Sequence, residues 1–301
     1  MSRSRLRPSV LLIALVGLVL PLEGLAAETC PAPGQWLGAD GERVASDTLM
    51  AEFAERRVVM LGEQHDRLAH HRWQLHTLAG LHAHHPRMVI GLEMLPREAQ
   101  PALDAWVAGE LDEAGFLEAS EWHSAWGFDP ALYFPILHFA RMQRIPLLAL
   151  NVTPTLRQRL VAEGWEAVPE QERYAITPPA APSEAYRGVL SDVFDQHPGD
   201  GDREAGLARF IDAQLVWDRA MATGLADASD ENTLVVGLIC QGHLTHGHGV
   251  PHQLDDLGLT DHRTLLPITP GPDCHFPEPG YADAVYLLGD ETPYEPPESS
   301  H

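Results

Sequence analysis

Six polar or ionisable side chains stand where apolar runs of this sequence end. They are, in chain order, Glu63, His65, Glu93, Asn151, Gln241 and His243. Imidazole nitrogens and carboxylate oxygens are ligands of zinc and iron, and they are also the groups of a general acid–base pair. The two glutamates and two histidines of this set are therefore candidate metal ligands or candidate catalytic groups.

The sequence offers no obvious nucleophile beside these groups. Neither a GxSxG nor an HExxH motif occurs. Cys240 ends the apolar run TLVVGLIC and is predicted to be a buried small hydrophobic residue. The glycine-rich stretch CQGHLTHGHG that begins there lacks the lysine of a phosphate-binding loop.

The elements that must bring these side chains together are strands. Four apolar runs, at 58–61, 88–92, 146–150 and 233–240, do not alternate with polar residues, which is typical of strands buried on both faces of a parallel sheet. Residues 264–268 predict a fifth strand and 284–288 a sixth at an edge.

Helical patterns separate the runs, so the sequence predicts an α/β fold: an open, mostly parallel sheet flanked by helices. Ligands bind outside the carboxyl ends of the strands in such sheets. The six polar side chains are therefore expected to converge on one rim of the sheet.

The connection between the third and fourth runs is far longer than one crossover needs. Residues 155–212 are predicted to form an inserted small helical subdomain, and the α/β domain comprises residues 27–154 and 213–288. The acidic, proline-rich tail 289–301 is predicted to be disordered.

The helix QLVWDRAMA follows the predicted insert. Gln214, Met221 and either Trp217 or Asp218 share one of its faces. That face either lines a pocket between the rim and the insert or belongs to the core. In the helix that begins near Leu68, at least one of His70 and His71 is expected to be exposed.

The N-terminus predicts export. Three arginines precede a short apolar run and then small residues, so residues 1–26 are predicted to be a secretory signal peptide. The run is too short to span a bilayer, and the mature protein is expected in the periplasm or cell envelope. Cys30 would offer a lipid anchor, although the residues before it fit that signal poorly. Alternatively, Cys30 and Cys274 form a disulfide.

The chain is strongly acidic. Its formal net charge is −23, with 43 acidic residues against 20 basic ones, and no lysine occurs. Such a surface repels nucleic acid and anionic lipid, so no nucleic-acid partner is expected. Seventeen histidines favour a metal or haem role.

Six separated segments together resemble a known family. They are LGEQHDRLAHH, GLEMLPREAQPALDAW, EWHSAWGFDPALYFPIL, LLALNV, QLVWDRAMA and GHLTHGHGVPHQL. Their order is similar to that of the ChaN-type iron-regulated, haem-binding lipoproteins of the wider Tiki/EreA-like superfamily. The resemblance covers roughly residues 56–257.

The resemblance implies haem held between the α/β domain and the insert, a tyrosine on the iron, and a homodimer with stacked haems. Tyr133 lies in a matching segment, whereas Tyr174 and Tyr186 lie in the insert. Tyr133 is either the ligand or a core residue whose hydroxyl bonds to a buried carboxylate. The candidate cofactor-binding residues are Tyr133, His65, His243, Gln214 and Met221.

Other branches of the superfamily are hydrolases, namely Tiki-type metal-dependent proteases and erythromycin esterases. Their GxxH-like motif corresponds to residues 62–65, followed by Glu93 and His243. The sequence thus predicts an exported haem- or iron-binding protein of the cell envelope. The alternative is a metal-dependent hydrolase with a divalent metal ion, or a Glu/His acid–base hydrolase.

Overall fold

The residues that the structure describes are built around one eight-stranded sheet. The structure is a computed structural model and describes residues 31–196, 202–271, 276–289 and 294. The predicted signal peptide, Cys30 and Cys274 lie outside these ranges. None of the helices within them is both long and apolar enough to cross a bilayer.

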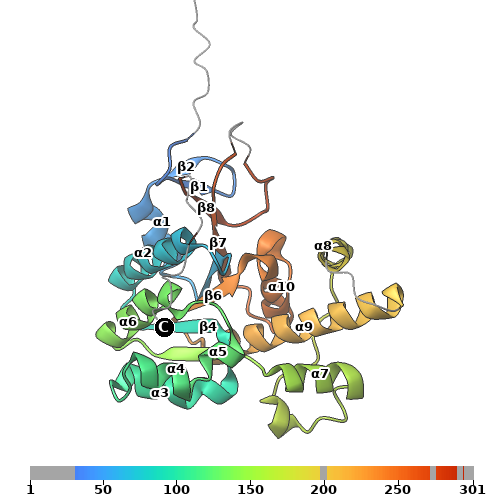
Figure 1. Ribbon diagram of the computed structural model, residues 1–301. Helices are drawn as coiled ribbons and strands as arrows, with labels where there is room; N and C mark the ends of the chain where they lie inside the picture. The colour runs from blue at the N-terminus through green and yellow to red at the C-terminus, as the bar shows by residue number, and fades with distance from the viewer. Residues whose placement is uncertain (1–30, 197–201, 272–275, 290–293, 295–301) are drawn as a thin grey trace, which may run out of the picture. The chain divides into compact units, whose positions relative to one another are not determined.

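Six of the strands are parallel and carry the candidate site (Figure 1). They are β3 (Val58–Glu63), β4 (Met88–Pro96), β5 (Leu147–Asn151), β6 (Leu234–Cys240), β7 (His262–Ile268) and β8 (Ala284–Leu287). The order across the sheet is β2-β1-β8-β7-β3-β6-β4-β5. The predicted α/β fold with an open, mostly parallel sheet is confirmed.

One edge of the sheet differs from the prediction. The strand predicted at the edge, β8, is covered by β1 (Trp36–Gly38), and β2 (Arg43–Val44) lies beyond it. Both pairings are antiparallel, with Trp36 opposite Tyr286. These strands have three and two residues, too short to show a periodic pattern.

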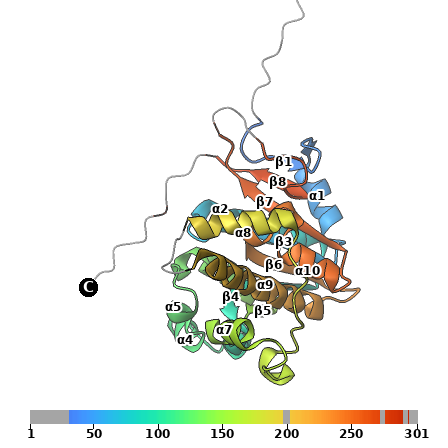
Figure 2. The same cartoon turned by 90° about the vertical axis from the view of Figure 1, so that its right-hand side faces the viewer.

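Alternate residues of each strand enter two separate cores, because side chains of a strand point to opposite faces. Val59 and Leu61 of β3 belong to one core, and Val58 and Met60 belong to the other. The first core is covered by α1 (Ser46–Phe53), α2 (Leu68–His84), α3 (Gln100–Ala108), α4 (Glu113–Ala119), α5 (Trp122–Ala125) and α6 (Phe134–Gln143). The second is covered by α9 (Arg203–Ala228) and α10 (Val250–Asp256), which Figure 2 shows on the near side of the sheet.

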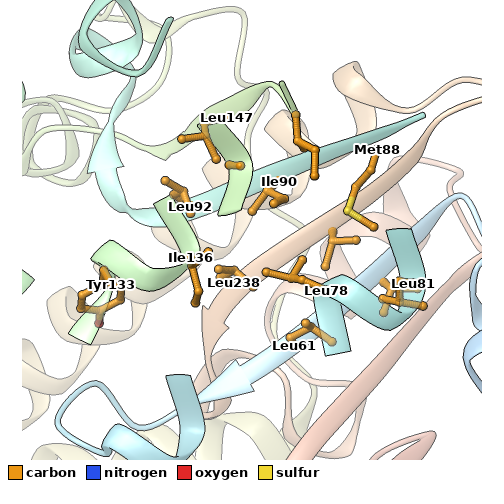
Figure 3. Packing of buried hydrophobic residues seen from close by; sticks show 14 of the residues in the cluster. Leu61, Leu78, Leu81, Met88, Ile90, Leu92, Tyr133, Ile136, Leu147 and Leu238 are labelled. Atoms are coloured by element: carbon orange, nitrogen blue, oxygen red, sulfur yellow. The ribbon is translucent and has the colours of Figure 1, made fainter. Parts of the chain in front are cut away.

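The first core fixes the sheet against its helices (Figure 3). Leu61, Ile90 and Leu238 come from adjacent strands and pack against Leu78 of α2 and Ile136 of α6, and each of the five is at most 2% exposed. Full burial of one such side chain contributes about 1.5–3 kcal/mol. This packing makes the strand ends a rigid platform.

The connection from β5 to β6 contains α7 (Pro154–Glu163), α8 (Glu184–Asp195) and α9. The predicted boundary between residues 212 and 213 falls inside α9, which is one continuous helix of 26 residues. Contacts within residues 31–301 form one compact unit that includes the insert.

An arginine and a glutamine hold the loop that leads into α8. Arg219 of α9 donates to Asp256 Oδ2 (2.6 Å) and to Thr177 Oγ1 (2.6 Å). The Gln253 side chain of α10 exchanges two hydrogen bonds with the backbone of Ala180, at 2.9 and 3.0 Å. These bonds fix the course of the chain before α8, which then reaches the strand ends.

Candidate functional site

The order of the strands brings the carboxyl ends of β3, β6 and β4 side by side. In the ladder, Glu63 of β3 lies opposite Cys240 of β6, and Leu92 of β4 lies opposite Leu238. The residues that follow these three strands therefore lie at the same height along the sheet. Asn151, which ends β5, donates its Nδ2–H to the carbonyl oxygen of Glu93 at 3.0 Å. The structure thus brings Glu63, Glu93 and Asn151 together at this end of the sheet, and Gln241 lies beside Gly62.

An irregularity in β4 positions Glu93. The pairing of β4 with β5 shifts between Leu92 and Pro96, and such bulges re-aim side chains at the ends of strands. The Glu93 carboxylate accepts the backbone N–H of Cys240 at 2.5 Å. Burial raises the pKa of Glu93, because a low dielectric disfavours the charged form.

Glu63 is the centre of the first group of polar contacts. His65 Nδ1–H donates to Glu63 Oε1 at 2.8 Å, and the Tyr133 hydroxyl donates to the same oxygen at 2.9 Å. Burial alone would raise the pKa of Glu63, but the hydrogen bond from His65 and the charge of His71 outweigh it, so the pKa is lowered. The carboxylate therefore remains charged although only 1% of the residue is exposed.

His65 is the histidine of this group that solvent reaches, with 21% of its side chain exposed. Burial lowers its pKa, but the neighbouring Cys240 and Glu63 side chains outweigh this effect and raise the pKa to about 10. The ring stands edge-on to Trp126 (4.5 Å between centroids) and lies 5.0 Å from Phe128. Since Glu63 occupies Nδ1, the Nε2 atom is the one left for a ligand.

The expectation that at least one of His70 and His71 is exposed is wrong. They are 6% and 2% exposed. His70 Nδ1 accepts the backbone N–H of Gln64 at 3.0 Å. His71 donates from Nε2 to the carbonyl oxygen of His65 at 3.0 Å, and its Nδ1 lies 3.4 Å from Glu63 Oε2. Both rings therefore support the turn that carries His65.

Tyr133 is 2% exposed, and its hydroxyl is fully engaged. It donates to Glu63 and accepts the indole N–H of Trp126 at 3.1 Å. Burial and the charge of Glu63 raise the pKa of the phenol, which disfavours a phenolate. The geometry matches the second of the two alternatives, a core tyrosine bonded to a buried carboxylate.

His243 belongs to a second group, which reaches into the insert. Its Nδ1–H donates to Asp218 Oδ1 of α9 at 2.6 Å, and its Nε2 lies 3.7 Å from Glu93 Oε1. The Tyr186 hydroxyl of α8 donates to Asp218 Oδ2 at 2.9 Å. Burial lowers the pKa of His243, but Asp218 outweighs burial and raises it to about 9.

The structure corrects the prediction for Cys240. It is half-buried and is the last residue of β6, so its thiol is not enclosed inside the strand. It interacts with the His65 imidazole, which itself is bonded to Glu63. Cys240 also lies opposite Glu63 in the ladder, so a thiol, an imidazole and a carboxylate gather at this strand end, and these are the residue types that activate a nucleophile.

Some residues on the predicted face of α9 lie in the core, and others lie beside the site. Met221 is completely buried in the second core, so it is a packing residue. Gln214 is half-buried, one turn before Trp217, whose ring stands edge-on to His243 with 5.8 Å between centroids. Of the two alternatives for this face, core packing fits Met221, and a position beside the rim fits Trp217 and Asp218.

Among the residues that the structure describes, no group of three or more histidine, cysteine, aspartate or glutamate side chains is arranged to hold a metal ion. Of the four predicted ligands, His65 pairs with Glu63, whereas His243 pairs with Asp218 and its Nε2 lies 3.7 Å from Glu93 Oε1. The pairs can bind protons, orient an imidazole and polarise water.

Sequence reasoning missed Asp218 and Tyr186 as partners of His243. One signal for Asp218 was present: Leu215, Ala222 and Leu225 lie on its face of α9 and are buried, so the carboxylate interrupts an apolar stripe. Burial of an unpaired carboxylate costs several kcal/mol, which calls for a partner. Tyr186 carries no comparable signal.

Comparisons with known proteins agree with this architecture. The sequence profile of the family described as "Haem-binding uptake, Tiki superfamily, ChaN" matches residues 49–254. The structure is similar to that of ChaN of Campylobacter jejuni with cofacially bound haem, at a TM-score of 0.67 and 16% identity, covering 83% of this chain and 95% of that one. No curated protein matches the sequence.

Two further solved structures show weaker likeness. The type III effector HopBA1 has a TM-score of 0.48 at 13% identity, over 82% of this chain and 94% of that chain. A mutant of erythromycin esterase EreC in its open conformation has a TM-score of 0.45 at 15% identity, over 85% and 84%.

Proposed function

The chain belongs to the haem-binding uptake family of the Tiki superfamily that includes ChaN, and we propose that it binds haem at the strand-end rim, beneath α8 and α9. The observation that carries the proposal is His65. It is an accessible imidazole at the rim, its Nδ1 is held by a buried carboxylate, and two aromatic rings stand beside it.

These residues fit a porphyrin. Bound haem would supply an iron that takes an imidazole as axial ligand, and a carboxylate on the far nitrogen is the usual support of a metal-bound histidine. His65 would release the Nε2 proton that its raised pKa retains and present Nε2 to the iron, while Glu63 fixes the ring. Trp126 and Phe128 would pack against the apolar macrocycle.

The tyrosines that the resemblance suggests are less suited to the iron. The hydroxyl groups of Tyr133 and Tyr186 both donate to buried carboxylates. Tyr174 is half-buried, and burial together with Glu98 raises its pKa to about 12. We therefore propose His65 as the ligand and Tyr133 as a residue that positions Glu63.

Haemin titration of the purified protein tests this proposal. The Soret band should shift and saturate, and His65→Ala should weaken binding at least tenfold because the axial donor is lost. Tyr133→Phe is the matched control and should retain the spectrum of the wild type. Equal affinity of His65→Ala and the wild type, or a spectral change confined to Tyr133→Phe, would contradict the assignment of the ligand.

We also propose that the protein is exported and that it forms a homodimer. Export rests on residues 1–26, with their three arginines and apolar run, and it would deliver the protein to the cell envelope. A homodimer with facing rims would suit stacked haems. Size-exclusion chromatography during the titration reports the dimer together with the ligand.

Hydrolysis is a second candidate function, favoured by the pairing of Cys240 with His65 and Glu63. Because the pKa of His65 is raised to about 10, its imidazolium would hold the proton of the Cys240–His65 pair while the sulfur forms a bond to the carbonyl carbon of an ester. The imidazolium would return the proton to the departing alkoxide, leaving a thioester. Water would then hydrolyse the thioester, with His65 again accepting and returning a proton.

This second candidate predicts a covalent intermediate. Incubation with an activated aryl ester should add one acyl group to Cys240, as seen by peptide mass spectrometry, and haemin should protect the thiol because both uses require His65. Cys240→Ser should abolish the adduct and His65→Gln should slow it at least tenfold. Ester turnover at the rate of buffer, with no adduct, would rule this function out.

A further inference from the structure

Arg157 lies at the edge of the rim. β5 ends at Asn151 and α7 begins at Pro154, so the first turn of α7 stands at the carboxyl end of the sheet. The guanidinium of Arg157 stacks on the ring of Trp217, with its Cζ 3.9 Å from the ring centroid. Trp217 in turn stands edge-on to His243. The ring of Trp217 thereby lies between the guanidinium of Arg157 and the imidazole of His243.

Arg157 has no acidic partner among the residues that the structure describes. No ion pair joins it to a carboxylate of residues 31–196, 202–271 or 276–289, and burial lowers its pKa without any opposing acidic neighbour. Arg159, two residues further along α7, differs: it bonds to Glu172 at 2.8 Å and to Glu163 at 3.4 Å. Other half-buried arginines without an ion pair, such as Arg97 and Arg141, donate to backbone carbonyl oxygens, whereas no side-chain hydrogen bond of Arg157 is found within the described part of the chain.

The geometry leaves the charge of Arg157 incompletely compensated. A guanidinium keeps its charge on burial, and stacking on tryptophan offsets the lost hydration only in part. Its planar fork of N–H donors suits a carboxylate, which it binds with two parallel hydrogen bonds. The ring of Trp217 restricts the guanidinium to one plane, so little ordering is required when an anion arrives.

We propose that Arg157, held flat by Trp217, binds a carboxylate of the ligand at the rim. The inference rests on the proposed function, in which that carboxylate is a haem propionate. Arg157 would then set the preference for an acidic porphyrin over a neutral one of the same shape.

The experiment compares haemin with its dimethyl ester, whose propionates carry no charge. Dissociation constants are measured by Soret titration for the wild type, Arg157→Gln and Arg159→Gln. The wild type should prefer haemin at least tenfold, the effect expected of a hydrogen bond between charged groups. Arg157→Gln should bind both porphyrins with nearly equal affinity, whereas Arg159→Gln, whose arginine is paired with Glu172 and Glu163, should keep the preference.

A second variant at Arg157 tests whether the first one loses its preference only because the structure is disturbed. Arg157→Lys keeps the charge without the planar fork and should retain part of the preference for haemin. If Arg157→Gln discriminates as the wild type does, the inference is wrong while haem binding stands. If the wild type binds neither porphyrin, the proposed function fails and the inference with it.

Discussion

Replacing Asp218 by asparagine should lower the free energy of unfolding by about 3 kcal/mol at pH 6, and this loss should shrink as the pH rises through 9. Burial lowers the pKa of His243, and Asp218, ahead of Glu93 and Cys240, outweighs burial and raises it from 6.5 to about 9. A pKa shift of one unit corresponds to about 1.4 kcal/mol. The asparagine has the same shape, so the variant removes charge and leaves packing intact.

The sign follows from proton linkage. A histidine whose pKa is raised in the folded state contributes its full stabilisation below the unfolded pKa of 6.5. The contribution falls between pH 6.5 and about 9 as the folded imidazole loses its proton. Urea unfolding at several pH values measures this contribution to the free energy of unfolding. The control is Asp212→Asn, an exposed position on the same helix. A loss of stability independent of pH would show that Asp218 acts through packing alone.

Replacing Gly249 by alanine should disrupt the same pair. A Cβ atom at Gly249 would lie 2.5 Å from the carbonyl oxygen of His243 and 2.9 Å from Asp218 Oδ1. The backbone there has φ +58° and ψ −117°, which residues other than glycine avoid. Because the nearest atom belongs to the backbone, relief requires movement of the turn that carries His243, at an expected cost of about 3 kcal/mol.

The control for this variant is Gly247→Ala. Gly247 also has a positive φ, of +70°, but no atom lies within 4 Å of the added Cβ. Both variants therefore suffer backbone strain, and only Gly249→Ala crowds the site. Thermal unfolding and haemin titration should show a clearly larger loss for Gly249→Ala. Equal losses of stability and haemin affinity in the two variants would mean that backbone strain, and not contact with His243, causes them.

The sheet could be predicted from sequence because its strands are buried on both faces. The runs at β3, β4, β5 and β6 are continuous and apolar, and the polar residues that follow them mark where the strands end. β1 and β2 could not be predicted, since a two- or three-residue strand is defined by its partner. Tyr286 of β8 supplies that partner for Trp36.

The candidate site was predictable to the extent that it lies at strand ends. Glu63, Glu93 and Asn151 terminate runs that the pattern reveals, and topology then brings them together. Tyr186 and Asp218 join the site through α8 and α9, whose positions depend on tertiary packing. His71 reaches Glu63 only because α2 begins close behind the strand.

The interpretation of Cys240 as a buried residue or as a possible nucleophile depends on where β6 ends. Counted as the last residue of an apolar run, it appeared to be enclosed. In the structure, β6 ends at Cys240, and the thiol interacts with His65. The sequence pattern placed the strand correctly, and only the register with Glu63 revealed the neighbour.

The most direct test of haem binding at the rim is the position of iron in crystals of the haemin complex. Diffraction data at the iron absorption edge give an anomalous peak at each iron. We expect a peak within bonding distance of His65 Nε2, beside Trp126 and Phe128, with a propionate at Arg157. An iron bound on another surface, or one whose protein ligand lies away from the ends of β3, β4 and β6, would contradict it.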